Sequence, residues 1–126
     1  MTIIDTLFDW LAESPGYTGV FENVRGAWVA SSTGRAQRYA TLTMMPGGNF
    51  DSLLERGSVR LLLLGAENDP DVVGLEQFAL DLRKRLQTDY KACGIAQILL
   101  VGGIIGPGLT EEGRPWYEMN FSVISE

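Results

Sequence analysis

The sequence contains no histidine and only one cysteine, Cys93, among its 126 residues. Without histidine the chain cannot build Ser-His or Cys-His pairs for nucleophilic catalysis, a histidine-ligated zinc site, or the usual general base near neutral pH. One cysteine can form neither a disulfide within the chain nor a cysteine-rich metal site. We therefore expect no catalytic residues, no metal and no cofactor.

Basic residues are also few: 10 lysines and arginines stand against 16 acids, and the formal net charge is −6. The basic surface of a nucleic-acid binder and the polybasic cluster of a membrane-surface protein are both missing. No apolar run approaches the ~20 residues that span a bilayer. The first residues carry no basic group before Asp5, so a signal peptide is not expected. Together with the single cysteine, this pattern predicts a protein of a reducing compartment.

Carboxylates alone can carry catalysis, so paired acids are the remaining candidates for an enzyme. Glu111 and Glu112 are adjacent in a glycine-rich turn, and Asp69 and Asp71 stand on either side of Pro70. A solvated turn explains the first pair, and carboxylates that complement the positive end of a helix explain the second. The sequence therefore favours a protein without enzymatic activity.

One glycine-rich segment comes close to a phosphate-binding loop. Gly103 and Gly108 have the spacing of the G-x-x-x-x-G-K-[ST] motif and Thr110 occupies its last position, but Leu109 stands where the motif needs lysine. A turn follows instead of a helix. We interpret the segment as a hairpin loop, with a bulge at the Gly102-Gly103 pair.

Two amphipathic helices are predicted. The first covers residues 2–12, with Thr2 as its cap and an apolar stripe on one side. The second begins with Asp69 as N-cap and Pro70 at its first position. Its buried face consists of apolar residues at three- and four-residue spacing, namely Leu75, Phe78, Ala79, Leu82 and Leu86.

Strands are predicted between the helices, over residues 26–30, 38–45 and 58–64. Residues 46–49 break the second of these strands, and a loop is expected over residues 50–57. The third strand ends in four consecutive leucines, which indicates burial on both faces and a central place in a sheet.

A long antiparallel hairpin closes the chain, with an apolar first strand over residues 95–105 and a turn over 106–114. In the last strand Tyr117, Met119, Phe121 and Val123 alternate with Glu118, Asn120 and Ser122, which predicts one dry and one wet face. Trp116 is a large aromatic on the wet side and is therefore a candidate contact residue. The whole pattern predicts one domain, residues 1–126, with an α+β fold: a mainly antiparallel sheet with two helices on one face, in two layers.

The order of elements is similar to that of a known family. A short helix is followed by a strand that runs into Met45–Gly48, a helix that begins at Asp69–Asp71, and a last strand, Gly113–Val123, of the form G-x-x-x-Y-x-x-x-F-x-V. This arrangement, over most of the chain, resembles the tail terminators and minor capsid (tail completion) proteins of long-tailed bacteriophages and prophages.

The resemblance implies a structural role in the virion tail and neck, with assembly in the host cytoplasm. A protein of this kind forms a ring, usually of six copies, that caps the tail tube and joins it to the head connector. Its partners would be further copies of itself, the tail tube protein and the head-connector protein. DNA would pass through the ring without specific binding, and no membrane would be involved.

Candidate contact residues lie on the wet face of the hairpin and on two loops. They are Trp116, Glu118, Asn120, Pro46, Gly47, Phe50, Asp51, Glu111, Glu112 and Arg114. The alternative is a cytoplasmic α+β module that binds a protein or a small ligand. An apolar pocket lined by Phe78, Phe121 and Trp28 would be its sign.

Overall fold

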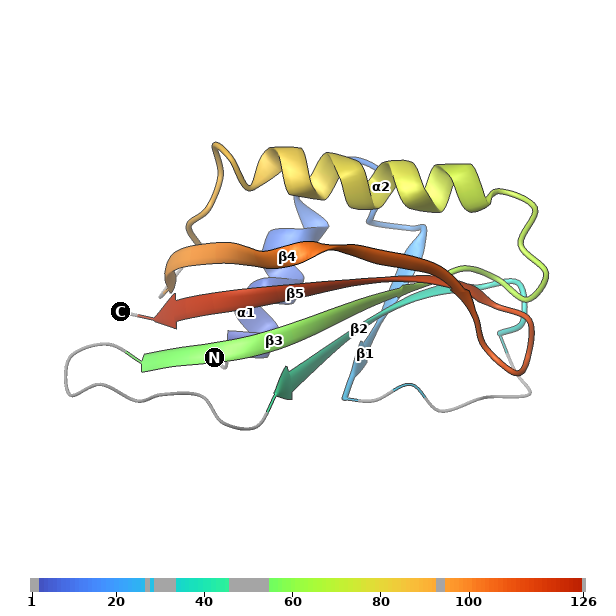
Figure 1. The fold of residues 1–126 in the computed structure, drawn as a ribbon, viewed down its shortest axis with the longest axis horizontal. Helices are drawn as coiled ribbons and strands as arrows, with labels where there is room; N and C mark the ends of the chain where they lie inside the picture. The colour runs from blue at the N-terminus through green and yellow to red at the C-terminus, as the bar shows by residue number, and fades with distance from the viewer. Residues whose placement is uncertain (1–2, 27, 29–33, 46–54, 93–94, 126) are drawn as a thin grey trace.

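The computed structural model describes residues 3–26, 28, 34–45, 55–92 and 95–125 (Figure 1). Within these ranges, two helices and five strands follow one another. In order they are α1 (Ile3–Ala12), β1 (Phe21–Arg25), β2 (Arg38–Met45), β3 (Glu55–Leu64), α2 (Val72–Arg85), β4 (Ile95–Leu109) and β5 (Pro115–Ser125). No helix within these ranges is both long enough and apolar enough to cross a membrane.

The five strands form one open sheet in the order β1-β2-β3-β5-β4. β1 runs parallel to β2, and the other three neighbouring pairs are antiparallel. The predicted α+β class with a mainly antiparallel sheet is confirmed. β3 lies in the centre, as its leucines predict: Leu61, Leu63 and Leu64 are fully buried, and Leu62 is partly buried.

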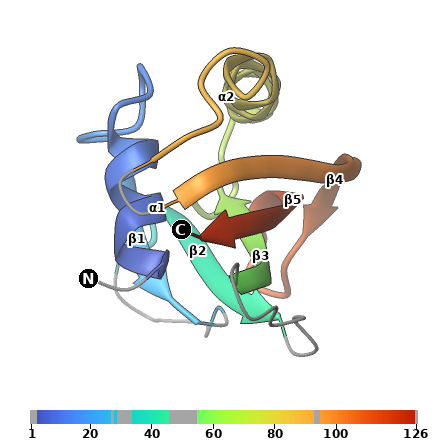
Figure 2. The same ribbon diagram turned by 90° about the vertical axis from the view of Figure 1, so that its left-hand side faces the viewer.

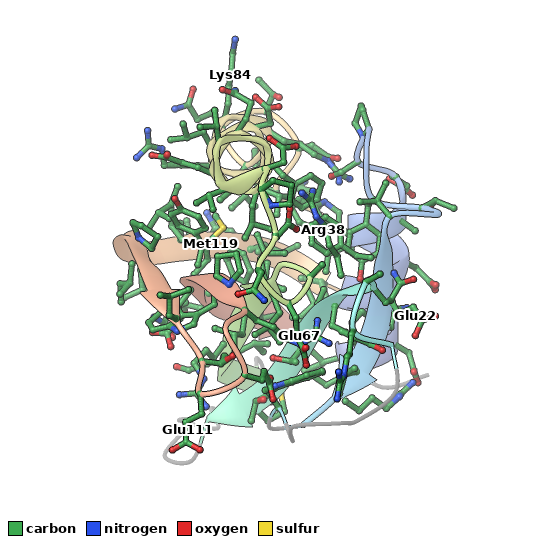
Figure 3. The ribbon with its side chains drawn as sticks, turned by 90° about the vertical axis from the view of Figure 1, so that its right-hand side faces the viewer. Glu22, Arg38, Glu67, Lys84, Glu111 and Met119 are labelled. Carbon is green, nitrogen blue, oxygen red and sulfur yellow. The ribbon has the colours of Figure 1, made fainter. Side chains whose placement is uncertain are left out.

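Both helices cover the same face of the sheet (Figures 1 and 2). α2 lies along β4 and β5, and α1 packs against β2. The apolar core fills the space between these two layers, and Met119 of β5 lies there beneath α2 (Figure 3). The predicted stripe of α2 points into this core, with Leu75, Phe78, Ala79, Leu82 and Leu86 all buried. At the opposite side of α2, Lys84 points away from the protein (Figure 3).

The start of α2 differs from the prediction. Asp71, not Asp69, is the N-cap, and its Oδ1 accepts a hydrogen bond from the Gly74 backbone N–H at 3.0 Å. The Asp69 carboxylate is occupied elsewhere, because it binds the Arg38 guanidinium and the Ala66 backbone N–H. Pro70 therefore lies before the helix and not at its first position.

Three strand boundaries also differ from the prediction. The first strand is residues 21–25 and not 26–30, because these residues pair with β2; Gly26 follows with φ +84°, and residues 27, 29 and 30 lie outside the described ranges. β3 begins at Glu55, inside the predicted loop, because residues 55–57 pair with the end of β5. β4 continues to Leu109, so the final turn is shorter than predicted. The predicted break at 46–49 lies outside the described ranges.

Candidate interaction surface

Of the two helices in the described part of the chain, neither covers the second face of the sheet, and we call this face the open face. Its polar part lies on β3 and β5, where Arg60, Glu118 and Asn120 are neighbours. Arg60 Nη1 is 3.8 Å from Glu118 Oε1, and Asn120 Nδ2 donates a hydrogen bond of 3.2 Å to Glu118 Oε2. All three residues are partly exposed. These groups offer hydrogen bonds and charges of both signs to a partner.

The apolar part of the open face lies on β4. Leu99 pairs with Ser122, Val101 with Asn120, and Ile105 with Glu118. Since directly paired residues point to the same face of a sheet, these three aliphatic side chains share the open face with the polar residues of β5. Their exposed fractions are 44%, 55% and 49%. We call Leu99, Val101 and Ile105 the aliphatic strip.

Trp116 lies on the open face beside Gly108 of β4, its paired residue. A Cβ atom at position 108 would lie 2.2 Å from Trp116 Cε2, so the indole ring occupies the space that a side chain there would need. The ring is partly exposed. Gly108 therefore explains why a large aromatic stands on the wet side of the strand.

Arg114, by contrast, is completely buried, with an exposed fraction of 0%. Its Nη1 donates to the carbonyls of Gln37 at 2.8 Å and Gly65 at 3.0 Å, and its Nη2 donates to the Gly34 carbonyl at 3.0 Å. These bonds join three segments at the hairpin-turn end of the sheet. Because this side chain is held inside the protein, we leave Arg114 out of the contact surface.

Aromatic rings and an acid surround the Arg114 guanidinium. Its Cζ lies 5.1 Å from the ring centroid of Trp28 and 5.2 Å from that of Tyr39. Glu112 Oε1 lies 3.5 Å from Arg114 Nε and accepts a hydrogen bond from Trp28 Nε1. The Glu112 side chain is only 13% exposed. Glu112 therefore belongs to the support of this end of the sheet, whereas the neighbouring Glu111 is exposed at the turn (Figure 3).

A second polar network holds the loop between β3 and α2. Arg38 binds Asp69 through two hydrogen bonds, Nε to Oδ2 at 2.9 Å and Nη2 to Oδ1 at 3.2 Å. Burial alone would raise the pKa of Asp69, but the hydrogen bonds from Arg38 and from the backbone N–H groups of Asp71 and Ala66 lower it to about 2. The Asp69 carboxylate therefore stays charged.

The predicted contact residues fall into three groups. Trp116, Glu118 and Asn120 come together on the open face, and Glu111 lies beyond them at the exposed turn. Glu112 and Arg114 lie inside. Four others are outside the described ranges, namely Pro46, Gly47, Phe50 and Asp51. The sequence reasoning missed the aliphatic strip, because it described residues 95–105 only as the apolar first strand of the hairpin and named none of them as a contact residue. The complete lack of charge in that segment was the available signal.

A cavity of about 220 Å³ lies between α2 and the end of α1, lined by Ser14, Pro15, Phe78, Asp81, Leu82 and Arg85. Arg85 is already bound to Glu13 and Asp89, and its Cζ lies 4.0 Å from the Trp10 ring centroid. Of the pocket residues expected for a ligand-binding module, only Phe78 lines this cavity. Within the described ranges, no group of three or more His, Cys, Asp or Glu side chains could hold a metal ion.

The fold and the open face thus define an α+β protein with one sheet face available for contacts. The entire chain, residues 1–126, matches the family of phage tail termination proteins, and the protein belongs to that family. Membership makes it a structural component of a phage tail, which confirms the resemblance derived from the order of elements. No curated protein matches the chain.

Proposed function

We propose that the protein forms a ring that caps the phage tail tube, stops its polymerisation and presents its other side to the head connector. Family membership supports tail termination as the function. The observation that carries the proposal is the open face, where an aliphatic strip on β4 lies beside polar residues on β5. A surface of this mixed kind is typical of a protein interface.

The mechanism would consist of binding alone. Copies around a ring meet through two different patches, one on each neighbour, because the contact is heterologous. We assign the contact with the tail tube to Trp116, Glu118 and Asn120 on the open face and to Glu111 at the turn. No covalent step enters this mechanism.

The net charge of −6 is consistent with a channel for DNA. Negative groups along a lumen repel the phosphates, so DNA would pass without being held. Ordinary solubility is a second role of the same charge.

A tube-length assay tests the function. Purified tail tube protein is polymerised with and without this protein, and tube lengths are measured by electron microscopy. We expect short, capped tubes when the protein is present and uncontrolled growth in its absence. Equal length distributions in the two samples would contradict the proposed function.

The variant Trp116→Asp tests the assigned contact in the same assay. It places a charge in the centre of the surface, and we expect tubes to grow as if no protein were added. Tyr90→Asp is the matched control, because Tyr90 is an aromatic residue of 39% exposure in the connection between α2 and β4. Circular dichroism establishes that both variants are folded. Normal capping by a folded Trp116→Asp variant would remove Trp116 from the contact.

A further inference from the structure

The cavity between α2 and the end of α1, which we call the helix cavity, is mainly apolar inside. Its walls are Ser14, Pro15, Phe78, Asp81, Leu82 and Arg85. Phe78 and Leu82 are buried, whereas Pro15 and Asp81 are exposed. The two buried residues therefore form an apolar interior, and the exposed proline and aspartate lie at the opening.

The volume of the helix cavity, about 220 Å³, decides which class of ligand it can hold. Pockets for drug-sized ligands and cofactors measure roughly 300–1,000 Å³, so this cavity is too small for most of them. An apolar cavity of about 150 Å³ holds one benzene molecule. The helix cavity therefore fits a single aromatic ring.

Hydrogen bonds and ring contacts fix the walls of the helix cavity. Arg85 Nη1 donates to the Trp10 carbonyl at 2.7 Å and to Ser14 Oγ, so it ties the end of α1 to α2. Phe78 packs against Phe21, with ring centroids 5.0 Å apart. Because these walls are held before a ligand arrives, little conformational entropy is lost on binding.

Negative charge prevails around the opening. Arg85 is the one base among the lining residues, and the acids Glu13 and Asp89 lie 3.2 Å and 2.7 Å from its Nη2. The Asp81 carboxylate accepts a hydrogen bond from Gln77 Nε2 at 2.9 Å, which leaves its charge uncompensated. Since the Arg85 charge is already matched by two acids, a cation at the opening is attracted to Asp81.

We propose that the helix cavity binds an aromatic side chain of a partner protein that carries a lysine or arginine next to it in sequence. The ring enters between Phe78 and Leu82, and the cation lies beside Asp81. A partner's side chain suits the cavity better than a free small molecule, because an aromatic anchor in a small pocket is supported by the contacts that surround it in an interface. This inference goes beyond the proposed function, since the helix cavity lies in the helix layer, away from the open face (Figures 1 and 2).

Three blocked dipeptides test the ring and the cation separately: acetyl-Phe-Lys-amide, acetyl-Ala-Lys-amide and acetyl-Phe-Glu-amide. Each is titrated to about 10 mM into isotope-labelled protein, because one buried side chain gives millimolar affinity. We expect acetyl-Phe-Lys-amide to shift the backbone amide NMR signals of Ser14, Phe78 and Leu82. The alanine peptide should bind at least about tenfold more weakly, since it lacks the ring. The glutamate peptide should bind about fivefold more weakly, since Asp81 repels it. Equal affinities of the three peptides, or no shift at these signals, overturns the proposal.

Asp81→Lys and Glu22→Lys separate the local charge from the net charge. Both variants replace an exposed acid by a base, but Asp81 lines the helix cavity and Glu22 lies on β1. We expect Asp81→Lys to bind acetyl-Phe-Lys-amide about fivefold more weakly and to prefer acetyl-Phe-Glu-amide. Glu22→Lys should bind like the wild type. Amide spectra that agree outside the cavity establish that both variants are folded. An unchanged preference in folded Asp81→Lys shows that Asp81 does not select the cation, and the proposal fails.

Phenethylamine tests whether the ligand is a side chain or a free amine. It offers the ring and the cation without a peptide backbone, so we expect weaker binding than that of acetyl-Phe-Lys-amide. Equal or tighter binding of phenethylamine identifies a small-molecule site and overturns the assignment to a partner protein. All these titrations use the protein without tail tube protein, so their failure leaves the outcome of the tube-length assay unaffected.

Discussion

The two strands of the closing hairpin, β4 and β5, follow opposite rules of composition although they share the same two faces. From Tyr117 to Val123, β5 alternates between apolar and polar residues: Met119 and Phe121 point to the helices, and Glu118 and Asn120 point to the open face. β4 is aliphatic on both faces. β5 has a neighbour on each side, whereas β4 has one. The comparison teaches that the strand with one neighbouring strand exposes aliphatic side chains on the open face, whereas the strand between two neighbours exposes mainly polar ones.

The hairpin strands also differ in how their ends at the turn are held. The start of β5 is tied to the loop before α2, because Gly65 N–H donates to the Pro115 carbonyl at 2.8 Å and Asn68 N–H donates to the Gly113 carbonyl at 2.9 Å. Arg114 adds one hydrogen bond to this loop, from Nη1 to the Gly65 carbonyl at 3.0 Å. The last residue of β4, Leu109, is 73% exposed. At the turn, the start of β5 is therefore fixed by hydrogen bonds to the rest of the protein, whereas the end of β4 is exposed.

The largest difference between the two strands should appear when one apolar residue of each is replaced by alanine. Phe121→Ala removes a side chain of 2% exposure from the core, and we expect a loss of about 3–5 kcal/mol in the free energy of unfolding. Val101→Ala should change that free energy by less than about 0.5 kcal/mol, because the side chain is half exposed. Urea denaturation of the monomer measures both. A large loss for Val101→Ala would show that the aliphatic strip stabilises the monomer.

Arg114→Ala should have the next largest effect. It leaves three backbone carbonyls without their donor in a buried site, and we expect a loss of about 3 kcal/mol. Arg35→Ala is the control, because the Arg35 side chain is 70% exposed and its ion pair, from Nε to Glu67 Oε2, is long at 3.7 Å. The loss in the free energy of unfolding should be below about 1 kcal/mol. Thermal unfolding compares the two. Equal losses would mean that the buried bonds at the start of β5 contribute little.

Asp69→Asn tests the loop to which the start of β5 is tied. The pKa of Asp69 is lowered from 3.8 to about 2 in the folded protein, which corresponds to about 2 kcal/mol of stability at neutral pH. This contribution is fully present above about pH 4 and is lost as the pH falls through 2. Asp69→Asn should therefore be less stable by about 2 kcal/mol at pH 7, and the difference should shrink below pH 4. Denaturation at pH 7, 4 and 2 measures it; a difference independent of pH would refute the assigned pKa.

The smallest effect is expected where the two strands meet at Trp116. A Cβ atom in Gly108→Ala would collide with the indole ring, whereas nothing lies within 4 Å of a Cβ atom at Gly103. We expect Gly108→Ala to displace the ring at a cost of about 1 kcal/mol and to change the tryptophan fluorescence, and Gly103→Ala to leave the indole signal unaltered. Identical spectra for both variants would show that the ring does not depend on the glycine.

Much of this architecture was predictable, because it follows from periodicity. The α2 stripe, the alternation of β5 and the four leucines of β3 each identify their element and its buried side. The candidate site was less predictable. Trp116, Glu118 and Asn120 could be grouped because they share one strand face, but Arg114 could not be recognised as buried, since its hydrogen-bond acceptors lie 49 to 80 residues away in the chain.

The boundaries that were wrong depend on partners distant in sequence. Asp69 is a residue type that often caps helices, but its carboxylate binds the Arg38 guanidinium, and Asp71 is the N-cap instead. Residues 55–57 have the composition of a loop, yet they form a strand because β5 extends beside them. Competition for a hydrogen-bond partner is decided only when the chain has folded.

The amino-acid sequence by itself determined both helices, most of the strands, the buried sides of α2 and β5, and the family, because these follow from local periodicity and from a pattern that covers the whole chain. Only the tertiary structure decided which residues are neighbours. It made β4 an edge strand, exposed its aliphatic strip and enclosed Arg114. The physical reason is that strand order and burial arise from contacts between distant segments, which no local pattern records.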